Sequence, residues 1–250
     1  MGVKLTALPI HPSLFLLTIP NSPFAHSHHE GWYQSMLWSM IVDRCFISIP
    51  GLTIERTETT SQPGAARKNR DRKEAAERQL IGPRHDAIIR TLQDGALELG
   101  AVEDSSSFRG GETSTKWLDD NFKLIRSMHD MLYRIHKSVD YNQKAIRNVQ
   151  TFGFVTTGLT LQFLRLGYPG CGHVSLLCRE KPMNLPTTIK QLPSLLAMIV
   201  LFTSFRKVAM ASLNAIEDYL IGQDLATTCK IVDGSGAGSV GGLYYSGDSQ

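Results

Sequence analysis

The sequence predicts an α+β domain in which a mainly antiparallel sheet of two hairpins is covered by two long helices. The first observation is the pair Asp94-Gly95, which lies between two β-prone runs and favours a tight hairpin. The second is the recurrence of apolar residues every three or four positions between Ser114 and Gly153, which is typical of an amphipathic helix. The third is a similar apolar pattern after Pro193, a residue that suits the first turn of a helix.

The composition indicates one ordinary domain with loose ends. Hydrophobic residues make up 42% of the 250 residues, and the formal net charge of +3 indicates no particular partner. The four cysteines lie far apart without a CxxC pair, as in an intracellular protein of the cytoplasm or nucleus. We expect residues 1–46 to be poorly ordered, residues 47–221 to form the domain, and the Gly/Ser-rich residues 222–250 to be a flexible tail.

The first half of the domain begins with a strand. Residues 47–57 alternate in polarity as a short strand does, and residues 57–66 have the composition of a loop. Residues 67–80 favour a charged helix, which Gly82-Pro83 ends before the hairpin around Asp94-Gly95.

The long helix follows the hairpin. Ser114 or Thr115 is its expected N-cap and Gly153 its expected end. Its apolar spacing predicts one face packed on the sheet, with these residues buried: Phe122, Ile125, Leu132 and Ile135.

The second half of the domain repeats the order of hairpin and helix. Residues 154–166 and 173–179 read as two strands joined by a Pro169-Gly170 turn. A last helix should run from Pro193 to about residue 221, with Ile199, Phe202 and Leu213 buried. Its apolar run 195–205 is short of the roughly 20 residues needed to cross a bilayer, so we expect a buried helix and no membrane span.

Two carboxylates are the only hint of chemistry. A two-residue turn at Asp94-Gly95 sets a register in which Asp86 lies opposite Glu103 and Ile88 opposite Ala101. Opposed carboxylates repel each other, so they call for a metal ion, a shared proton or a nearby cation.

This pair resembles the acidic pair of the PD-(D/E)xK nuclease-like superfamily. There, an Asp on one strand of a hairpin and a Glu on the next bind Mg²⁺, and a long helix follows. The resemblance covers residues 53–180 and implies a restriction-endonuclease-like fold with Asp86 and Glu103 as catalytic residues and metal ligands. The chain is also similar to uncharacterised fungal proteins of no assigned activity, on the segments Gly82–Asp86, Thr115–Asp120 and Val155–Leu159.

The sequence departs from the superfamily pattern at two places. His85, rather than Pro, precedes Asp86, and Ser105 stands where the pattern has its lysine. Taking Glu98 as the acid instead puts Gly100 at the lysine position and Glu98 on the opposite face from Asp86.

A displaced cation could replace the missing lysine. Lys116 or Lys123, near the start of the long helix, could supply it, as some members of the superfamily allow.

Charge is concentrated in one segment. Residues 67–84 carry seven basic and three acidic side chains and could contact nucleic acid or a protein partner. Because position 105 lacks the lysine, the sequence favours a non-catalytic, degenerate nuclease-like interaction module that needs no cofactor. The alternative is an Mg²⁺-dependent phosphodiesterase or nuclease acting on nucleic acid.

Overall fold

A computed structural model describes residues 23–74, 78–92, 96–106, 114–170 and 174–235. Its centre is one open sheet with the strand order β1-β2-β3-β4-β5-β6, and β7 also pairs with β5. Every pairing is antiparallel except that of β3 with β4, which is parallel. The predicted α+β class is therefore confirmed, with one mostly antiparallel sheet. The strands are β1 (Leu52–Thr60), β2 (Arg84–Thr91), β3 (Glu98–Glu103), β4 (Gln150–Thr157), β5 (Thr160–Gly167), β6 (Leu176–Arg179) and β7 (Met183–Asn184).

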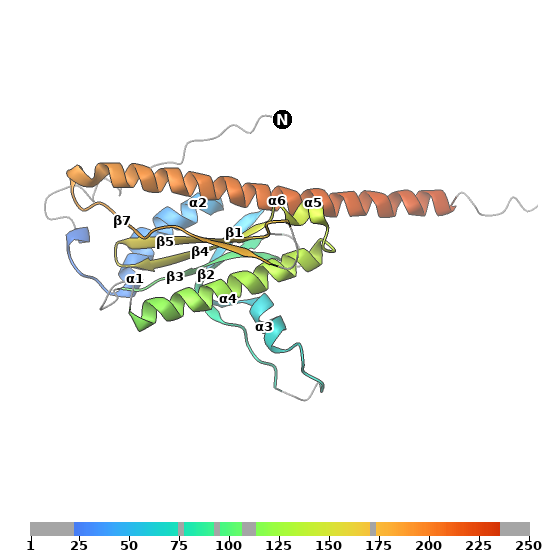
Figure 1. Ribbon diagram of the computed structural model, residues 1–250, viewed down its shortest axis with the longest axis horizontal. Coiled ribbons are helices and arrows are strands. Elements are labelled where there is room, and N and C mark those ends of the chain that lie inside the picture. The colour runs from blue at the N-terminus through green and yellow to red at the C-terminus, as the bar shows by residue number, and fades with distance from the viewer. Residues whose placement is uncertain (1–22, 75–77, 93–95, 107–113, 171–173, 236–250) are drawn as a thin grey trace, which may run out of the picture.

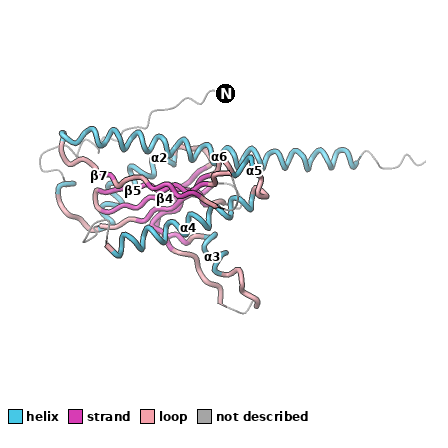
Figure 2. Tube along the Cα trace, viewed as in Figure 1, coloured by secondary structure: helices cyan, strands magenta, loops and turns pink. Residues whose placement is uncertain are grey.

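Helices cover both faces of this sheet (Figures 1 and 2). The helix α4 lies on one face, while α2 and the first part of α6 lie on the other. The parallel step from β3 to β4 needs a long crossover, and α4 is that crossover. The two long helices are α4 (Thr115–Ser138) and α6 (Leu192–Ser235). The shorter ones are α1 (Glu30–Tyr33), a π-helical stretch (Gln34–Asp43), α2 (Arg44–Ile47), α3 (Gln62–Lys68) and α5 (Gln143–Ile146), with 3₁₀ turns at Pro23–Ala25 and Ile189–Gln191.

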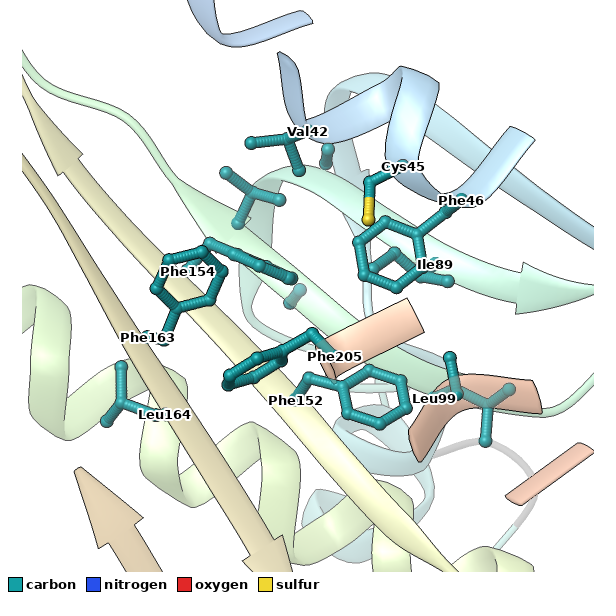
Figure 3. Packing of buried hydrophobic residues seen from close by; sticks show 14 of the residues in the cluster. Val42, Cys45, Phe46, Ile89, Leu99, Phe152, Phe154, Phe163, Leu164 and Phe205 are labelled. Atoms are coloured by element: carbon teal, nitrogen blue, oxygen red, sulfur yellow. The ribbon is translucent and has the colours of Figure 1, made fainter. Parts of the chain in front are cut away.

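Phenylalanines fill the space between the sheet and α6 (Figure 3). The ring of Phe163 lies 4.5 Å from that of Phe205 and 4.8 Å from that of Phe202, centroid to centroid. Such aromatic pairs add about 0.5–1.5 kcal/mol each to the free energy gained by burial alone. Phe46 of α2 joins them, with its ring 5.5 Å from Phe154. The core is thus built from segments more than 150 residues apart in the chain.

The expected disorder of residues 1–46 is wrong for the part that the structure describes. Trp38 and Val42 of the π-helical stretch are fully buried, and the indole N–H of Trp38 donates to the carbonyl of Gly158 at 3.0 Å. The absence of a regular 3.6-residue period misled the prediction, because a π-helix does not follow that period.

The helix α4 begins where predicted and ends earlier. Ser114 caps it by accepting a hydrogen bond from the N–H of Trp117, and the helix stops at Ser138 rather than near Gly153. Gly153 instead lies within β4, where a Cβ would come within 2.7 Å of Leu124 and Met128. The glycine therefore allows α4 to approach the sheet closely.

The buried face of α4 is shifted by one position from the predicted stripe. Leu132 and Ile135 are buried as expected and Ile125 is half-buried, but Phe122 is 78% exposed. On α6, Phe202 and Leu213 are buried as expected, while Ile199 is half-buried. The residues that α4 buries toward the sheet include Trp117, Asn121, Leu124, Met128 and Met131.

Two predicted boundaries in the second half are also wrong. The single expected strand 154–166 is a hairpin of β4 and β5 that turns at Gly158, whose φ of +54° suits a glycine. The expected pairing of the following strand is confirmed, since β6 pairs with β5. Helix α6 passes through Gly222 to Ser235, so residues 222–235 are helical rather than a flexible tail. One glycine costs a helix about 1 kcal/mol relative to alanine, which its neighbours can offset.

Helix α6 is unusually long and apolar. By length and composition, its segment Pro193–Thr228 could cross a membrane, a test that the core helix of a soluble protein also passes. Met198, Phe202 and Phe205 pack into the core, while the C-terminal part of α6 extends past the end of the sheet (Figure 1). The expectation of no membrane span stays a prediction.

Candidate active site

In the hairpin of β2 and β3, the strand residues farther from the turn pair in the predicted register. Ile88 pairs with Ala101, as predicted, and Ala87 pairs with Val102. Continuing this register by one residue brings Asp86 opposite Glu103. Nearer the turn the register slips by one, because Arg90 pairs with Glu98. The turn residues Asp94 and Gly95, which set the predicted count, lie outside the described residues.

Both carboxylate oxygens of Glu103 are bonded to cationic or polar side chains. One contacts Nδ1 of His85, and the other accepts a hydrogen bond from Nζ of Lys123 at 2.8 Å. The other ring nitrogen of His85 lies 2.9 Å from Oγ of Ser127. Lys123 and Ser127 are one helical turn apart on α4, so this helix supplies both ends of a chain running from Ser127 through His85 and Glu103 to Lys123.

Asp86 lies beside this chain in a more negative environment. Its Oδ2 accepts a hydrogen bond from the backbone N–H of Asp104 at 2.7 Å. Burial raises the pKa of Asp86 to about 6, against the lowering effect of that N–H. Negative charge on Glu103, Asp104 and Glu30 raises this pKa further. The repulsion expected from the sequence is therefore present, and it acts on Asp86.

Of the two candidate displaced lysines, only Lys123 reaches Glu103. Lys116 instead lies 3.9 Å from Asp120, one turn along the same helix, with 55% of its side chain exposed. Burial raises the pKa of Asp120 above its ordinary value, and the positive charge of Lys116 opposes this shift only in part. Charge on Glu103 and Glu30 also raises this pKa, so Asp120 belongs to the same electrostatic environment as Asp86.

Ser105, which stands where the superfamily pattern has its lysine, is part of the folded core rather than of an exposed site. It is buried at the end of β3, and its carbonyl accepts the N–H of Gly158 at 2.9 Å. A lysine at position 105 would have to place its charge in this buried turn. The cation at Glu103 comes from α4 instead.

Sequence reasoning missed a second charged group behind Asp86. Asp104 is 3% exposed and accepts hydrogen bonds from Arg56 at 2.9 Å and from the hydroxyl of Thr156 at 2.6 Å. Arg56 also binds both carboxylate oxygens of Asp43. These residues come from four segments, so no local motif could have revealed them. They hold Asp104 in place, and they thereby fix the backbone N–H of Asp104 that donates a hydrogen bond to Asp86.

The alternative acid, Glu98, has a different role. It is 1% exposed and accepts hydrogen bonds from Arg90, from the hydroxyl of Ser61 and from the backbone N–H of Gln62. Because Ser61 is also the N-cap of α3, Glu98 holds the start of that helix against the sheet. Glu98 and Glu103 stand at the two ends of β3.

The carboxylates of Asp86 and Glu103 match the smallest set of protein ligands that Mg²⁺ uses. Mg²⁺ takes one or two carboxylates and completes its coordination with water and phosphate oxygens. Asp86 and Glu103 are such a pair, and a cation between them would offset the burial and the neighbouring negative charge that raise the pKa of Asp86. Within the described ranges, no three His, Cys, Asp or Glu side chains are grouped to form a complete metal cage.

Comparison with known proteins finds no matching family model, no matching curated protein and no matching solved structure.

Proposed function

We propose that this protein is an Mg²⁺-dependent phosphodiesterase of nuclease-like type that acts on nucleic acid. The observation that carries the proposal is the contact between Lys123 and Glu103 at 2.8 Å, next to Asp86. The absence of a lysine at position 105 was the reason to favour a non-catalytic protein, and a cation from α4 removes that reason. The order of parts, with Asp86 on β2, Glu103 on β3 and a long helix after them, supports a restriction-endonuclease-like fold.

Each residue has a distinct role in this proposal. Asp86 and Glu103 would hold Mg²⁺, which supplies a Lewis acid for the phosphate when bound. Lys123 offers its ammonium to the charge that develops on the phosphate. It is 37% exposed, so it can contact both Glu103 and a substrate in solution.

Two further residues would position this group. His85 holds Glu103 in one orientation, and Ser127 does the same for His85. Both act through Glu103 and are positioning residues rather than catalytic ones.

The test is divalent-dependent cleavage of single-stranded and duplex DNA and RNA by the full chain. We expect nicking with Mg²⁺ or Mn²⁺ that falls at least about 100-fold in Asp86→Asn, Glu103→Gln and Lys123→Met, the size typical of a lost charge-stabilising group. Lys207→Ala, on the exposed surface of α6, is the matched control and should cleave as wild type does. Loss of cleavage in Lys116→Ala but not in Lys123→Met would assign the cation to Lys116.

A second candidate is the non-catalytic interaction module. It is favoured by the observation that both oxygens of Glu103 are already bonded within the protein, to His85 and Lys123. Under this candidate the wild type shows no cleavage, and titration calorimetry finds no Mg²⁺ or Mn²⁺ binding that depends on Asp86. That pair of results would overturn the enzymatic proposal.

A further inference from the structure

Two adjacent cavities line the C-terminal half of α4, away from Glu103. The first, of 350 Å³, is walled mainly by aromatic rings: Tyr133, His136, Tyr141 and Tyr168. The second, of 430 Å³, lies between α3 and α4 and is lined by four cationic side chains: Arg67, Arg70, Arg134 and Lys137. His129 and Tyr133 line both, so the two cavities are neighbours, and α3 packs against α4 at this point (Figure 1).

The aromatic cavity contains an unsatisfied polar atom. His136 is 8% exposed, and its Nε2 is buried with no hydrogen-bond partner in the described part of the chain. Its ring stands edge-on to that of Tyr168, at 5.5 Å between centroids. Burial, together with the charge of His129, lowers the pKa of His136, which favours the neutral ring. A buried nitrogen without a partner is unfavourable, and a ligand with a polar edge would supply the missing hydrogen bond.

The backbone beside this cavity is strained. Asp140 and Tyr141 follow α4 with φ of +46° and +55°, values that residues other than glycine rarely adopt. The N–H of Tyr141 donates to the carbonyl of His136 at 2.8 Å, which fixes this conformation. The result turns Tyr141 back toward Tyr133, with ring centroids 6.4 Å apart. Backbone strain of this kind is concentrated at ligand sites.

The second cavity carries an excess of positive charge. Among the described residues that line it, Asp130 is the only one with a carboxylate, and it is paired with Arg67 at 2.8 Å. The guanidinium of Arg70 lies over the ring of Tyr133 at 5.6 Å, at the boundary between the two cavities. Arg134 and Lys137 form no ion pair with any residue that the structure describes. This cavity is therefore suited to an anion.

We propose that the two cavities together bind an unpaired nucleotide of a single strand, with its base among the rings and its phosphate on the cations. Aromatic platforms beside a positive groove are the general means by which proteins bind single strands without sequence preference. A duplex holds its bases in the stack and cannot insert one into a cavity without unpairing it. As an account of substrate recognition the proposal rests on the proposed function, although binding itself requires neither Asp86 nor Glu103.

The geometry of α4 connects this site with the candidate active site. Lys123 and Arg134 are eleven residues apart, close to three helical turns, so they lie on the same side of the helix. The helical rise separates them by about 16 Å, the length of roughly five stacked nucleotides. A strand held at Arg134 would therefore extend to Lys123.

The test is fluorescence anisotropy with a labelled oligodeoxythymidine of about 12 nucleotides, in EDTA so that no cleavage occurs. We expect Tyr133→Leu to weaken binding about 10-fold, and Tyr133→Phe, which keeps the ring, to bind as wild type does. The double variant Arg134→Ala/Lys137→Ala should reduce the slope of log affinity against log salt by about 1.4, as expected for two lost phosphate contacts on a single strand. Lys207→Ala should leave both affinity and slope unchanged.

Several outcomes would overturn the proposal. These are equal affinity for a duplex of the same length, competition by free thymidine monophosphate as strong as that by the oligonucleotide, or unchanged binding in the double variant. Circular dichroism checks that each variant is folded, and the variants of the half-buried Arg134 and the exposed Lys137 remain informative if Tyr133→Leu unfolds. Strand binding that persists in Asp86→Asn without any cleavage by wild type would reject the proposed function and retain the nucleotide site. Cleavage by wild type with no effect of Tyr133→Leu would do the reverse.

Discussion

Glu98 and Glu103 stand at opposite ends of β3, and both are buried, yet their surroundings differ. Glu98 accepts hydrogen bonds from Arg90, Ser61 and Gln62, and its side chain is fully buried. Glu103 is bonded to His85 and to the partly exposed Lys123, and it lies near a second acid, Asp86. We call the Glu98 end of the strand the closed end, because its cation, Arg90, is buried, and the Glu103 end the open end, because its cation, Lys123, is 37% exposed.

The difference separates stability from chemistry. At the closed end Arg90 is shared between the buried carboxylate of Glu98 and the exposed carboxylate of Glu55. At the open end Asp86, whose pKa is raised, lies near Glu103, and Glu103 binds the accessible ammonium of Lys123; such shifted groups are concentrated at functional sites. Variants at the two ends should therefore differ in what they change.

The largest expected effect is at the closed end. Arg90→Met removes the cation from the buried carboxylate of Glu98 and should lower the free energy of unfolding by about 3–5 kcal/mol. Urea denaturation followed by circular dichroism measures this. Arg165→Met is the matched control, because its partner Glu180 lies at 3.5 Å in a half-exposed pair, and it should cost less than about 1 kcal/mol. Similar losses in both variants would mean that Glu98 is not held as described.

The corresponding change at the open end should affect activity rather than stability. Lys123→Met removes a cation that is 37% exposed, so we expect a loss of stability of no more than about 1 kcal/mol. Cleavage should still fall at least about 100-fold. Unfolding and nicking are measured on the same preparation, and a stability loss as large as that of Arg90→Met would show that both ends are structural.

The parts of the fold that the sequence predicts are those set by local signals. The cap at Ser114 and the pairing of Ile88 with Ala101 each depend on a few neighbouring residues, and both are confirmed. Gly153 and Gly222 misled the prediction because a glycine ends a helix only in some contexts. Gly153 serves a close approach between α4 and β4, which is visible only in three dimensions.

The candidate site was predictable only in part, for a related reason. Asp86 and Glu103 lie on one hairpin, and the register beyond the irregularity at Ile89 and Arg90 brings them together. His85 was noticed only as a departure from the superfamily pattern, and nothing in its neighbourhood indicates a contact with Ser127. Lys123 could be named only as one of two options, because the choice depends on the rotation of α4 about its axis. That rotation follows from the buried stripe, which differs by one position from the predicted one.

Protonation of Asp86 offers a smaller effect with a defined sign. Its pKa is raised from 3.8 to about 6 in the folded protein, so the folded state binds a proton more tightly than the unfolded state. The folded protein therefore loses stability as the pH rises from about 4 to about 6, by on the order of 2 kcal/mol. Asp86→Asn keeps an acceptor for the N–H of Asp104 and removes the charge.

We therefore expect Asp86→Asn to be more stable than wild type at about pH 7 and equal to it at about pH 4, both measured in EDTA. Added Mg²⁺ should stabilise wild type and leave the variant unchanged, since only the carboxylate binds the ion. A stability difference that does not vary with pH would remove the basis for treating Asp86 as an ionisable member of the site.

The smallest effects come from two serines that make the comparison directly. Ser61 donates to Glu98 at the closed end, and Ser127 bonds to His85 at the open end. Ser61→Ala should cost about 1–2 kcal/mol, because it removes both a helix cap and a hydrogen bond to a buried carboxylate, and cleavage should be unchanged. Ser127→Ala should cost about 1 kcal/mol, since one neutral hydrogen bond is lost, while cleavage falls about 10-fold because His85 no longer fixes Glu103. Ser127→Thr, which keeps the hydroxyl, should restore most of the cleavage rate. If both alanine variants lower cleavage in proportion to their loss of stability, the two ends of β3 do not differ in function, and the open end is only a less complete version of the closed one.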